Sequence, residues 1–339
     1  MVTASGKPLV IGHRGASGYR PEHTKAAYEL AFALGADAVE PDIVATKDGV
    51  LVLRHESEIS STTDVASHPE FADRRTTKVI DGISLSGWFT EDFLWDELRT
   101  LRAIERLPDL RRAGAAFNGQ QGILRLSDLI EIIDRVSTAQ RRELIMVAEI
   151  KHATYFESIG LPLDELFASE IGHWATEDNL IVEAFEQTVL EKVRARGVPG
   201  KLVFLAEVSG SPADLVERFG NKALPYSAHL TPAGLARLAT AVDGLSIDKR
   251  LLLPDATGNA AATDLVANAH AAGLIVFCWT LRAENAFLAK NLRRGAAPDD
   301  FGDWLTEFRL ILDSGVDGVF ADQPDLVLEA LAPRSSLVK

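Results

Sequence analysis

The sequence predicts an α/β protein with a (β/α)8 barrel, and a doubly wound parallel sheet is the alternative. Two observations support this fold class. Short, almost continuous hydrophobic segments recur along all 339 residues, as expected for parallel strands that are buried on both faces. Amphipathic segments separate many of them, as expected for the helices of βα units. Eight strands are predicted, enough to close a barrel: Leu9–His13, Ala38–Ile43, Leu144–Ile150, Leu180–Phe185, Lys201–Val208, Gly244–Asp248, Leu274–Trp279 and Gly318–Asp322.

Three of the segments between these strands have clear helical patterns. In Thr24–Leu34, hydrophobic residues recur on one helical stripe, and Gly35 follows where a helix commonly ends. Asp264–Ala272 and Thr306–Asp313 show the same pattern, and each is followed by a glycine and then a strand. These patterns predict helices that cover the outside of the barrel.

The second predicted strand leads into a hairpin at Thr46–His55. Its turn has the sequence Lys47-Asp48-Gly49, which is typical of a tight connection between antiparallel strands. Val50–Leu53 then supplies a ninth, short strand. His55 is therefore expected at the end of a strand.

The residues from Glu56 to Leu126 are too many for an ordinary connection between a strand and a helix. They contain a helical pattern near Asp92–Arg102 and a polar loop at Asn118-Gly119-Gln120. We predict one domain over residues 1–339, with an inserted subdomain at 56–126 that forms a cap on the rim, between the second and third barrel strands. The cap should bury most of its aromatic side chains in a core of its own: Phe71, Trp88, Phe89, Phe93 and Trp95.

The composition restricts the class of partner. Lys and Arg number 35 against 49 Asp and Glu, which gives a formal net charge of −14. This acidic balance argues against nucleic-acid binding and against stable association with an anionic membrane. The single cysteine, Cys278, excludes a disulfide framework. The expected partner is a small molecule, and the sequence does not predict an oligomeric state.

The N-terminal residues bear on the compartment. Met1–Leu9 show no basic segment followed by a hydrophobic stretch, so no secretory leader is visible. No hydrophobic run approaches the roughly 18 residues that a membrane span needs. We therefore expect a cytoplasmic protein, and a periplasmic or secreted protein with a trimmed N-terminus is the alternative.

Polar side chains gather where the first four predicted strands end. The carboxyl ends of the strands form the face that carries the active site in barrel enzymes. Residues two positions apart on a strand point to the same side, so each polar pair of this kind should point the same way. The residues are His13 and Arg14, Glu40 and Asp42, Glu149 and Lys151, and Glu183.

Three of these side chains predict a metal site. The carboxylates of Glu40, Asp42 and Glu149 would repel one another if they converged without a cation between them. Oxygen ligands without a Cys or His cluster favour Ca²⁺ or Mg²⁺ over zinc. The alternative is that each carboxylate pairs with a nearby Arg or Lys.

The same residues belong to a series of motifs that resembles the glycerophosphodiester phosphodiesterase family. The resemblance extends from residue 9 to about residue 326. The motifs are His13-Arg14-Gly15, Pro21-Glu22-His23-Thr24, Gly35-Ala36-Asp37, Glu40-x-Asp42, Thr46-Lys47-Asp48-Gly49, His55, Glu149-x-Lys151, Trp279-Thr280, Gly315-Val316-Asp317-Gly318 and Asp322-x-Pro324. Within the long connection, Thr62–Val65 and Gly87–Phe93 resemble the long-insertion branch typified by periplasmic and secreted members.

The resemblance implies a (β/α)8 barrel, a divalent cation, and hydrolysis of glycerophosphodiesters to sn-glycerol 3-phosphate and an alcohol. Arg14 and Lys151 have the charge to bind the phosphate, and we count Arg14 among the catalytic residues as well. His13 and His55 have the chemistry to share the general acid and general base roles, and which residue takes which role stays open. We expect Glu183 and Trp279 to contact the substrate.

The chain departs from the family pattern at a few positions. His23 stands where Asn is usual, Glu56 where Asp is usual, and Glu183-Ala184-Phe185 where a Gln-Ser-Phe type of sequence is common. None of these changes removes a catalytic group, so they bear on substrate preference. The cap is expected to restrict the alcohol arm to small, soluble head groups, and shortening it should change alcohol preference more than phosphate chemistry.

Two alternative functions remain open. One is a barrel phosphodiesterase that acts on lipid head groups, like a sphingomyelinase D or a phospholipase; the acidic surface and the lack of an evident exposed apolar loop argue against it. The other is a non-catalytic phosphate-binding barrel. Loss of catalysis usually removes a metal ligand or a histidine, and this chain keeps them all.

Overall fold

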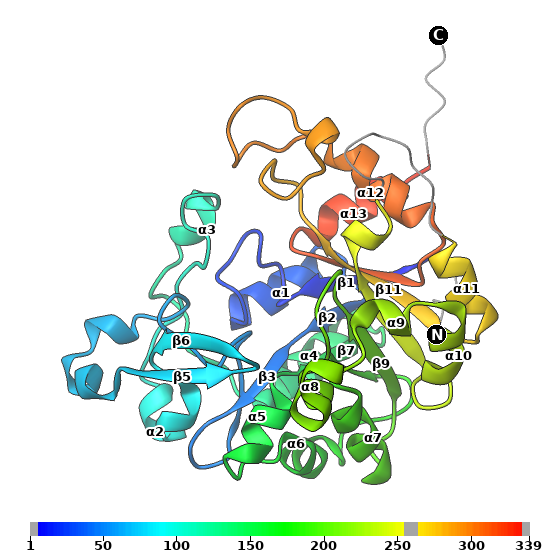
Figure 1. Cartoon of the computed structure of the whole chain (residues 1–339). Helices are drawn as coiled ribbons and strands as arrows, with labels where there is room; N and C mark the ends of the chain where they lie inside the picture. The colour runs from blue at the N-terminus through cyan, green and yellow to red at the C-terminus, as the bar shows by residue number, and fades with distance from the viewer. Residues whose placement is uncertain (1–5, 254–263, 334–339) are drawn as a thin grey trace.

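A computed structural model of the chain describes residues 6–253 and 264–333, and it shows a closed barrel of parallel strands surrounded by helices (Figure 1). The sheet closes because β2 pairs with both β1 and β7. This confirms the barrel and excludes the doubly wound alternative. The barrel strands are β1 (Leu9–His13), β2 (Ala38–Glu40), β3 (Asp42–Ala45), β7 (Ile145–Ile150), β8 (Leu180–Ala184), β9 (Lys201–Ala206), β10 (Gly244–Asp248), β11 (Ile275–Leu281) and β12 (Gly318–Ala321).

The second predicted strand, Ala38–Ile43, is divided in two. Pro41 has no backbone N–H to donate, and it separates β2 from β3. β2 lies between β1 and β7, whereas β3 pairs with β7 on one side and with the antiparallel β4 (Leu51–Leu53) on the other. The predicted hairpin is therefore present, and Gly49 supplies the positive φ of 78° that its turn requires.

Every second residue of the barrel strands points into the barrel, where these side chains form a core separate from the one under the helices. Toward the carboxyl ends the same alternation brings polar and aromatic side chains to the inner face. His13 follows Ile11 by two positions, and Glu149 follows Val147 in the same way. The inner core consists of Leu9, Ile11, Ala38, Val147, Ile181, Val203, Phe277 and Phe320.

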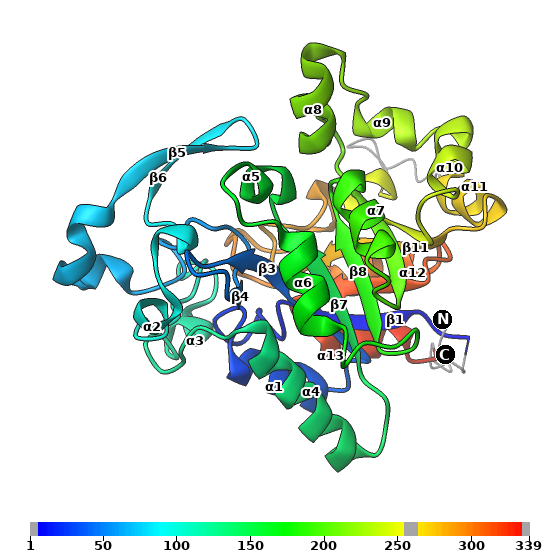
Figure 2. The ribbon, with the colours of Figure 1, turned by 90° about the horizontal axis from the view of Figure 1, so that it is seen from below.

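Helices cover the outside of the barrel, and α1 and α4 lie side by side on one flank (Figure 2). Thr24 caps α1 by accepting a hydrogen bond from the backbone N–H of Ala27. The helices that follow barrel strands are α1 (Lys25–Ala33), α4 (Leu126–Gln140), α5 (Ala153–Ser158), α6 (Leu163–Ile171), α7 (Gln187–Ala195), α8 (Ala213–Phe219), α9 (Tyr226–His229), α10 (Pro232–Leu238), α11 (Leu265–Ala271), α12 (Trp304–Leu312) and α13 (Pro324–Leu331).

Within the described residues, none of the helices has both the length and the hydrophobicity needed to cross a membrane. Residues 1–5, on which the expectation about a secretory leader partly rests, lie outside the described residues.

The chain between β4 and α4 forms a group of small elements at one side of the barrel (Figure 1). The predicted helix near Asp92–Arg102 is only the single turn of α2 (Trp95–Leu98), and α3 (Arg112–Ala115) is equally short. Sequence analysis missed the antiparallel hairpin of β5 (Thr76–Ile80) and β6 (Ile83–Gly87). Asp81-Gly82 at its turn was the signal, because both residues have the positive φ that this type of turn requires.

The aromatic side chains of this segment do not form a core of their own. Phe71, Trp88 and Phe93 are buried in the same cluster as Val52 of β4 and the residues under the barrel helices. Phe89 is fully buried and Trp95 is partly buried. The segment is thus held to the barrel by continuous hydrophobic packing.

Candidate active site

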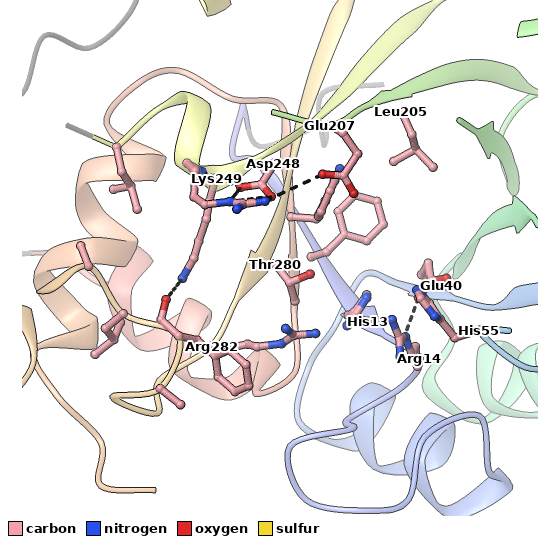
Figure 3. A pocket seen from close by; sticks show the side chains of 18 of the residues that line it. His13, Arg14, Glu40, His55, Leu205, Glu207, Asp248, Lys249, Thr280 and Arg282 are labelled. Atoms are coloured by element: carbon pink, nitrogen blue, oxygen red, sulfur yellow. Dashed lines mark hydrogen bonds and ion pairs between the residues drawn. The ribbon is translucent and has the colours of Figure 1, made fainter. Parts of the chain in front are cut away.

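The predicted site residues lie around a cavity of about 940 Å³. Most of them stand at the carboxyl ends of barrel strands, while Asp42 begins β3 and His55 follows β4. Figure 3 shows His13, Arg14, Glu40 and His55 together on one side of this cavity, with Asp248 and Lys249 on the opposite side. The strand register brings the first group together. His13 of β1 is level with Glu40 of β2, and Asp42 of β3 is level with Glu149 of β7, which is in turn level with Glu183 of β8.

The three predicted metal ligands converge. Glu40, Asp42 and Glu149 each offer a carboxylate oxygen, and these oxygens lie within 4.8 Å of one another. All three residues are buried, and Glu40 Oε1 and Asp42 Oδ1 have no hydrogen-bond partner among the described residues. Buried carboxylate oxygens without donors are costly unless a cation binds them, so this donor set fits a hard divalent cation.

Positive side chains neutralise only part of this cluster. Lys151 Nζ donates to Glu149 Oε1 at 2.6 Å and lies 3.6 Å from Asp42 Oδ1. Arg14 Nε lies 3.2 Å from Asp42 Oδ2. The alternative in which each carboxylate has its own basic partner is therefore incomplete, because Glu40 has no ion pair with a basic side chain within the described part of the chain.

The electrostatics of the cluster show the same imbalance. Burial and the nearby charges of Asp42 and Glu149 raise the pKa of Glu40 well above its usual value. Burial also raises the pKa of Glu149 to about 8, despite the favourable charge of Lys151. Burial alone would raise the pKa of Asp42 too, but Lys151, His55 and Arg14 hold it well below its usual value. A positive charge placed among the three carboxylates would favour the ionised form of all of them.

Arg14 is fixed with its guanidinium at the edge of the cluster. Its backbone is in the left-handed region, with φ of 57°, and its N–H donates to Glu40 Oε2 at 2.8 Å. Arg14 Nη1 donates to Glu22 Oε2 at 2.9 Å. Arg14 and Lys151 both line the cavity, so two cations stand where an anionic substrate would lie.

The two predicted catalytic histidines have matching environments. His13 Nδ1 lies 2.6 Å from Asp322 Oδ1, and His55 Nδ1 lies 2.5 Å from Glu56 Oε1. A carboxylate at Nδ1 fixes the ring and leaves Nε2 for other contacts, as in many catalytic and metal-binding histidines. Both residues line the cavity, with side chains that are 12% and 31% exposed.

Burial lowers the pKa of both imidazoles. The pKa of His13 falls to about 4 because of burial and the charge of Arg14, although Asp322 acts in the opposite direction. The pKa of His55 falls to about 3 because of burial and the charges of Arg14 and Lys151. Both rings are therefore neutral at pH 7 in the free protein, as a general base must be.

His23, which departs from the family pattern, is fully buried beside the cluster. Its Nε2 lies 2.9 Å from Asp42 Oδ2, and its Nδ1 lies 2.7 Å from the hydroxyl of Tyr28. Sequence analysis related this position to substrate preference, but its contacts are with a predicted metal ligand. His23 therefore orients Asp42.

The two predicted substrate contacts also line the cavity. Glu183 is buried, and its Oε2 has no hydrogen-bond partner among the described residues; the same holds for Trp279 Nε1. Trp279 packs edge-on against Phe185, with ring centroids 5.8 Å apart. An unsatisfied acceptor and an unsatisfied donor beside aromatic walls suit a ligand that carries hydroxyl groups.

Sequence analysis missed the residues that hold the histidines in place. Asp322, Arg106 and Arg111 were not assigned a role. Asp322 was visible as part of the motif Asp322-x-Pro324 at the end of the last strand. Arg106 and Arg111 had no comparable signal, because they lie in the irregular part of the long connection.

The model of the glycerophosphoryl diester phosphodiesterase family matches residues 13–326. A glycerophosphodiester phosphodiesterase of Arabidopsis thaliana is 31% identical over 332 residues, which cover 93% of this chain and 84% of that protein. One of Haemophilus influenzae is 26% identical over 353 residues, 95% of this chain and 89% of the relative.

Solved structures share the fold. A phosphodiesterase of Oleispira antarctica, in complex with the product sn-glycerol-3-phosphate, has a TM-score of 0.59 with 20% identity and covers 97% of this chain and 98% of that one. A glycerophosphodiester phosphodiesterase of Thermotoga maritima has a TM-score of 0.53 with 18% identity and covers 95% and 97%. The family match over most of the chain and the relative from Arabidopsis thaliana agree with the geometry of the site. The chain therefore belongs to the glycerophosphoryl diester phosphodiesterase family and is an enzyme of that family.

Proposed function

We propose that the protein hydrolyses glycerophosphodiesters to sn-glycerol 3-phosphate and an alcohol, with a divalent cation and with His13 and His55 as the general acid and base. The main support is the content of one cavity. It holds two histidines fixed at Nδ1, an acidic cluster, and two cations for the phosphate. The activity named for the relatives, and the product in the Oleispira complex, support the substrate class.

Glu40, Asp42 and Glu149 are the residues that would hold the cation. Two buried oxygens without a hydrogen-bond donor, Glu40 Oε1 and Asp42 Oδ1, support this assignment, and oxygen ligands suit Ca²⁺ or Mg²⁺. When bound, such a cation polarises the phosphoryl group and lowers the pKa of an oxygen nucleophile. Arg14 and Lys151 would bind the anionic phosphate oxygens beside it.

The histidines would move the protons. A neutral imidazole with a free Nε2 accepts the proton of the attacking water or hydroxyl, and the other imidazole, once protonated, donates to the leaving alcohol oxygen. The acid needs a pKa higher than that of the free protein. The negative charge of the bound phosphodiester would raise the pKa of both rings, so the acid would gain its proton as the substrate binds. Because both imidazoles are held at Nδ1 and line the cavity, the assignment of acid and base stays open.

Analysis of the products tests this proposal. Glycerophosphocholine, glycerophosphoethanolamine and glycerophosphoglycerol should each release sn-glycerol 3-phosphate and the free alcohol. Release of glycerol with phosphocholine or phosphoethanolamine from the first two diesters would mean that the other ester bond is cleaved, and the proposed reaction would be wrong. No phosphate ester cleavage with any of the three diesters, in the presence of Ca²⁺ or Mg²⁺, would contradict the substrate class.

We also propose that residues 56–126 are an inserted subdomain and that the chain belongs to the long-insertion branch of its family. The β5–β6 hairpin supports this, because it forms a two-stranded sheet that pairs with none of the described barrel strands. Among the described residues, the lining of the catalytic cavity includes none of the five aromatic residues of the segment. The lining includes no other described residue of 56–126 either, so any effect of the segment on the alcohol arm would come from the neighbouring groove that Val79 and Ile83 line.

One observation favours a second candidate function, the hydrolysis of lipid head groups. Val79 and Ile83, near the turn of the β5–β6 hairpin, are each 63% exposed. They line a groove of about 620 Å³ that shares Lys151 and Phe185 with the catalytic cavity. An exposed apolar hairpin was not expected from the sequence, and it could contact an acyl chain.

A direct comparison of substrates separates the two candidates. If lipids are substrates, replacing Val79 and Ile83 together by Ser should lower kcat/KM for lysophosphatidylcholine about tenfold or more, by loss of apolar burial, and leave glycerophosphocholine unchanged. If the unmodified enzyme does not hydrolyse lysophosphatidylcholine, the second candidate is wrong.

A further inference from the structure

Two arginines of the long connection reach the carboxylates that hold the histidines. Arg111 Nη2 donates to Asp322 Oδ2 at 2.5 Å, while Asp322 Oδ1 holds His13. Arg106 Nη2 donates to Glu56 Oε2 at 2.7 Å, while Glu56 Oε1 holds His55. Arg111 contacts the Asp322 oxygen that His13 does not contact, whereas Arg106 contacts both oxygens of Glu56, because its Nη1 also donates at 3.1 Å to the Oε1 that holds His55. The two arginines are five positions apart in the sequence.

We propose that Arg106 and Arg111 are positioning residues for the reaction: each fixes the carboxylate that orients one of the two histidines. The long connection thereby completes the proton-transfer groups of the barrel. This inference rests on the proposed roles of His13 and His55. It adds two residues, Arg106 and Arg111, that have no role in the proposed function.

The contacts of Arg111 are buried and bridge separate parts of the chain. Its side chain is 6% exposed, and Asp322 and Glu284 are 1% and 2% exposed. Arg111 Nε donates to Glu284 Oε1 at 2.8 Å, and its Nη1 donates to the carbonyl oxygen of Ser17 at 3.1 Å. Among the described residues, Asp322 has one other arginine partner, Arg282, at 2.7 Å. A buried carboxylate that loses one of two cationic partners is destabilised as an anion, so its hold on His13 would weaken.

Arg106 links the second histidine to the phosphate site. Its Nε and Nη2 each donate to a different oxygen of Glu22 at 2.7 Å, which is the forked geometry that arginine favours. Glu22 in turn accepts from Arg14. Arg106 therefore contacts the carboxylate beside His55 and the carboxylate beside Arg14, and its loss should affect both proton transfer and phosphate binding.

The backbone around the arginines is tied in place, as positioning requires. Glu105 N donates to Asn118 Oδ1 at 2.7 Å, and Leu107 N donates to Glu105 Oε1 at 2.9 Å. Arg111 N donates to the carbonyl oxygen of Leu107 at 2.8 Å. The turn that carries both arginines is thus a fixed part of the structure.

The experiment compares Arg111→Met and Arg106→Met with Arg112→Met in the full chain, with stability and metal content measured for each variant. Arg112 is exposed and adjacent to Arg111, so it controls for loss of charge in this turn. Arg111→Met should lower kcat by about 10–100-fold with KM changed less than threefold, as is typical when the partner of a functional side chain is removed. Arg106→Met should lower kcat similarly and also raise KM. Arg→Lys variants should recover part of the loss.

A substrate with a good leaving group distinguishes positioning from a general structural role. The p-nitrophenyl ester of glycerol 3-phosphate needs no protonation of its leaving group. If the arginines act on the histidines, the variant that disturbs the general acid should lose much less kcat on this ester than on glycerophosphocholine. The other variant should lose about equally on both substrates.

Three results would overturn the proposal. The first is a kcat for both Met variants within twofold of Arg112→Met. The second is an equal loss on both substrates for both variants, in step with lost stability or lost metal. The third applies if the Met variants do not fold: an unchanged kcat in both Lys variants would then contradict the proposal.

The controls His13→Ala and His55→Ala separate this test from the test of the proposed function. If these two variants keep full activity, the proposed function itself is wrong. If they lose activity while the arginine variants do not, only this inference fails.

Discussion

The barrel strands place charged groups in the lining of the catalytic cavity, whereas the long connection at residues 56–126 places charged groups against the carboxylates that hold the histidines. In the barrel, one rule places the side chains: inward residues alternate, so Glu149 follows Val147 and His13 follows Ile11. In the connection, Arg106 and Arg111 lie in an irregular turn, and only its tertiary contacts bring them to the site. Under the proposed roles, the barrel and its β3–β4 hairpin supply the reacting groups and the connection supplies their support.

The largest effect is expected at the acidic cluster, which belongs entirely to the barrel. Glu149→Gln removes one negative ligand and should lower kcat on the order of 10³-fold and weaken metal retention, because Lewis-acid stabilisation is worth several kcal/mol. Metal content after dialysis and kcat at saturating substrate measure this. Glu131→Gln, at an exposed position of α4, is the control. Normal activity of Glu149→Gln with no bound metal would remove Glu149 from the site.

The next effect concerns the two histidines, where barrel and connection meet. His13→Ala and His55→Ala should each lower kcat by about 10²–10⁴-fold, the usual contribution of general acid–base catalysis, without loss of metal. His173→Ala, at an exposed position, is the matched control. If either variant turns over at nearly the normal rate at pH 7, that histidine has only a structural role.

A smaller effect is expected at His23, which is buried beside the acidic cluster and orients Asp42. His23→Ala should weaken metal binding by about 10–100-fold, the usual cost of removing a residue that orients a metal ligand. His23→Asn keeps a hydrogen-bonding side chain and should be closer to the unmodified enzyme. Titration of the metal-free protein with Ca²⁺ or Mg²⁺ gives both affinities. Equal affinity in all three proteins would show that His23 does not act on the cluster.

The smallest effect on activity is expected at Glu105 of the long connection, where the expected change is a pH-dependent change in stability. Burial raises the pKa of Glu105 to about 7, and the side chain is 3% exposed. The folded protein therefore binds a proton that the unfolded chain releases above about pH 4.5, so stability falls as the pH rises from 4.5 through 7. Glu105→Gln should remove this loss, with a gain of roughly 2–3 kcal/mol at pH 8 and much less at pH 5. Unfolding curves at the two pH values measure the difference, and a gain that is equal at both would contradict the explanation.

The fold and the central residues of the site could be predicted because barrel strands obey a simple periodicity. The eight strands, the cluster of Glu40, Asp42 and Glu149, and the place of His13 at a strand end all follow from it. Where the structure differs from the predicted strands, the cause is local. Pro41 divides the second strand, and Asp81-Gly82 forms a turn whose flanking strands are mostly exposed, so they lacked the hydrophobic alternation of a half-buried hairpin.

The residues that hold the catalytic groups were harder to predict for a physical reason. Asp322 and Glu284 are far from Arg111 in sequence, and an ion pair between distant residues leaves no periodic pattern. His23 was visible as a departure from the family motif, but its contact with Asp42 depends on how the turn before α1 folds back on the barrel. Such contacts require the tertiary structure.

The most direct test of the central claim is metal-dependent release of sn-glycerol 3-phosphate from glycerophosphocholine. Enzyme treated with a chelator and freed of metal should release none, and stepwise addition of Ca²⁺ or Mg²⁺ should restore activity in proportion to one ion bound per chain. The same titration of Glu149→Gln should need far more metal. Full activity of the metal-free enzyme in excess chelator would contradict the account.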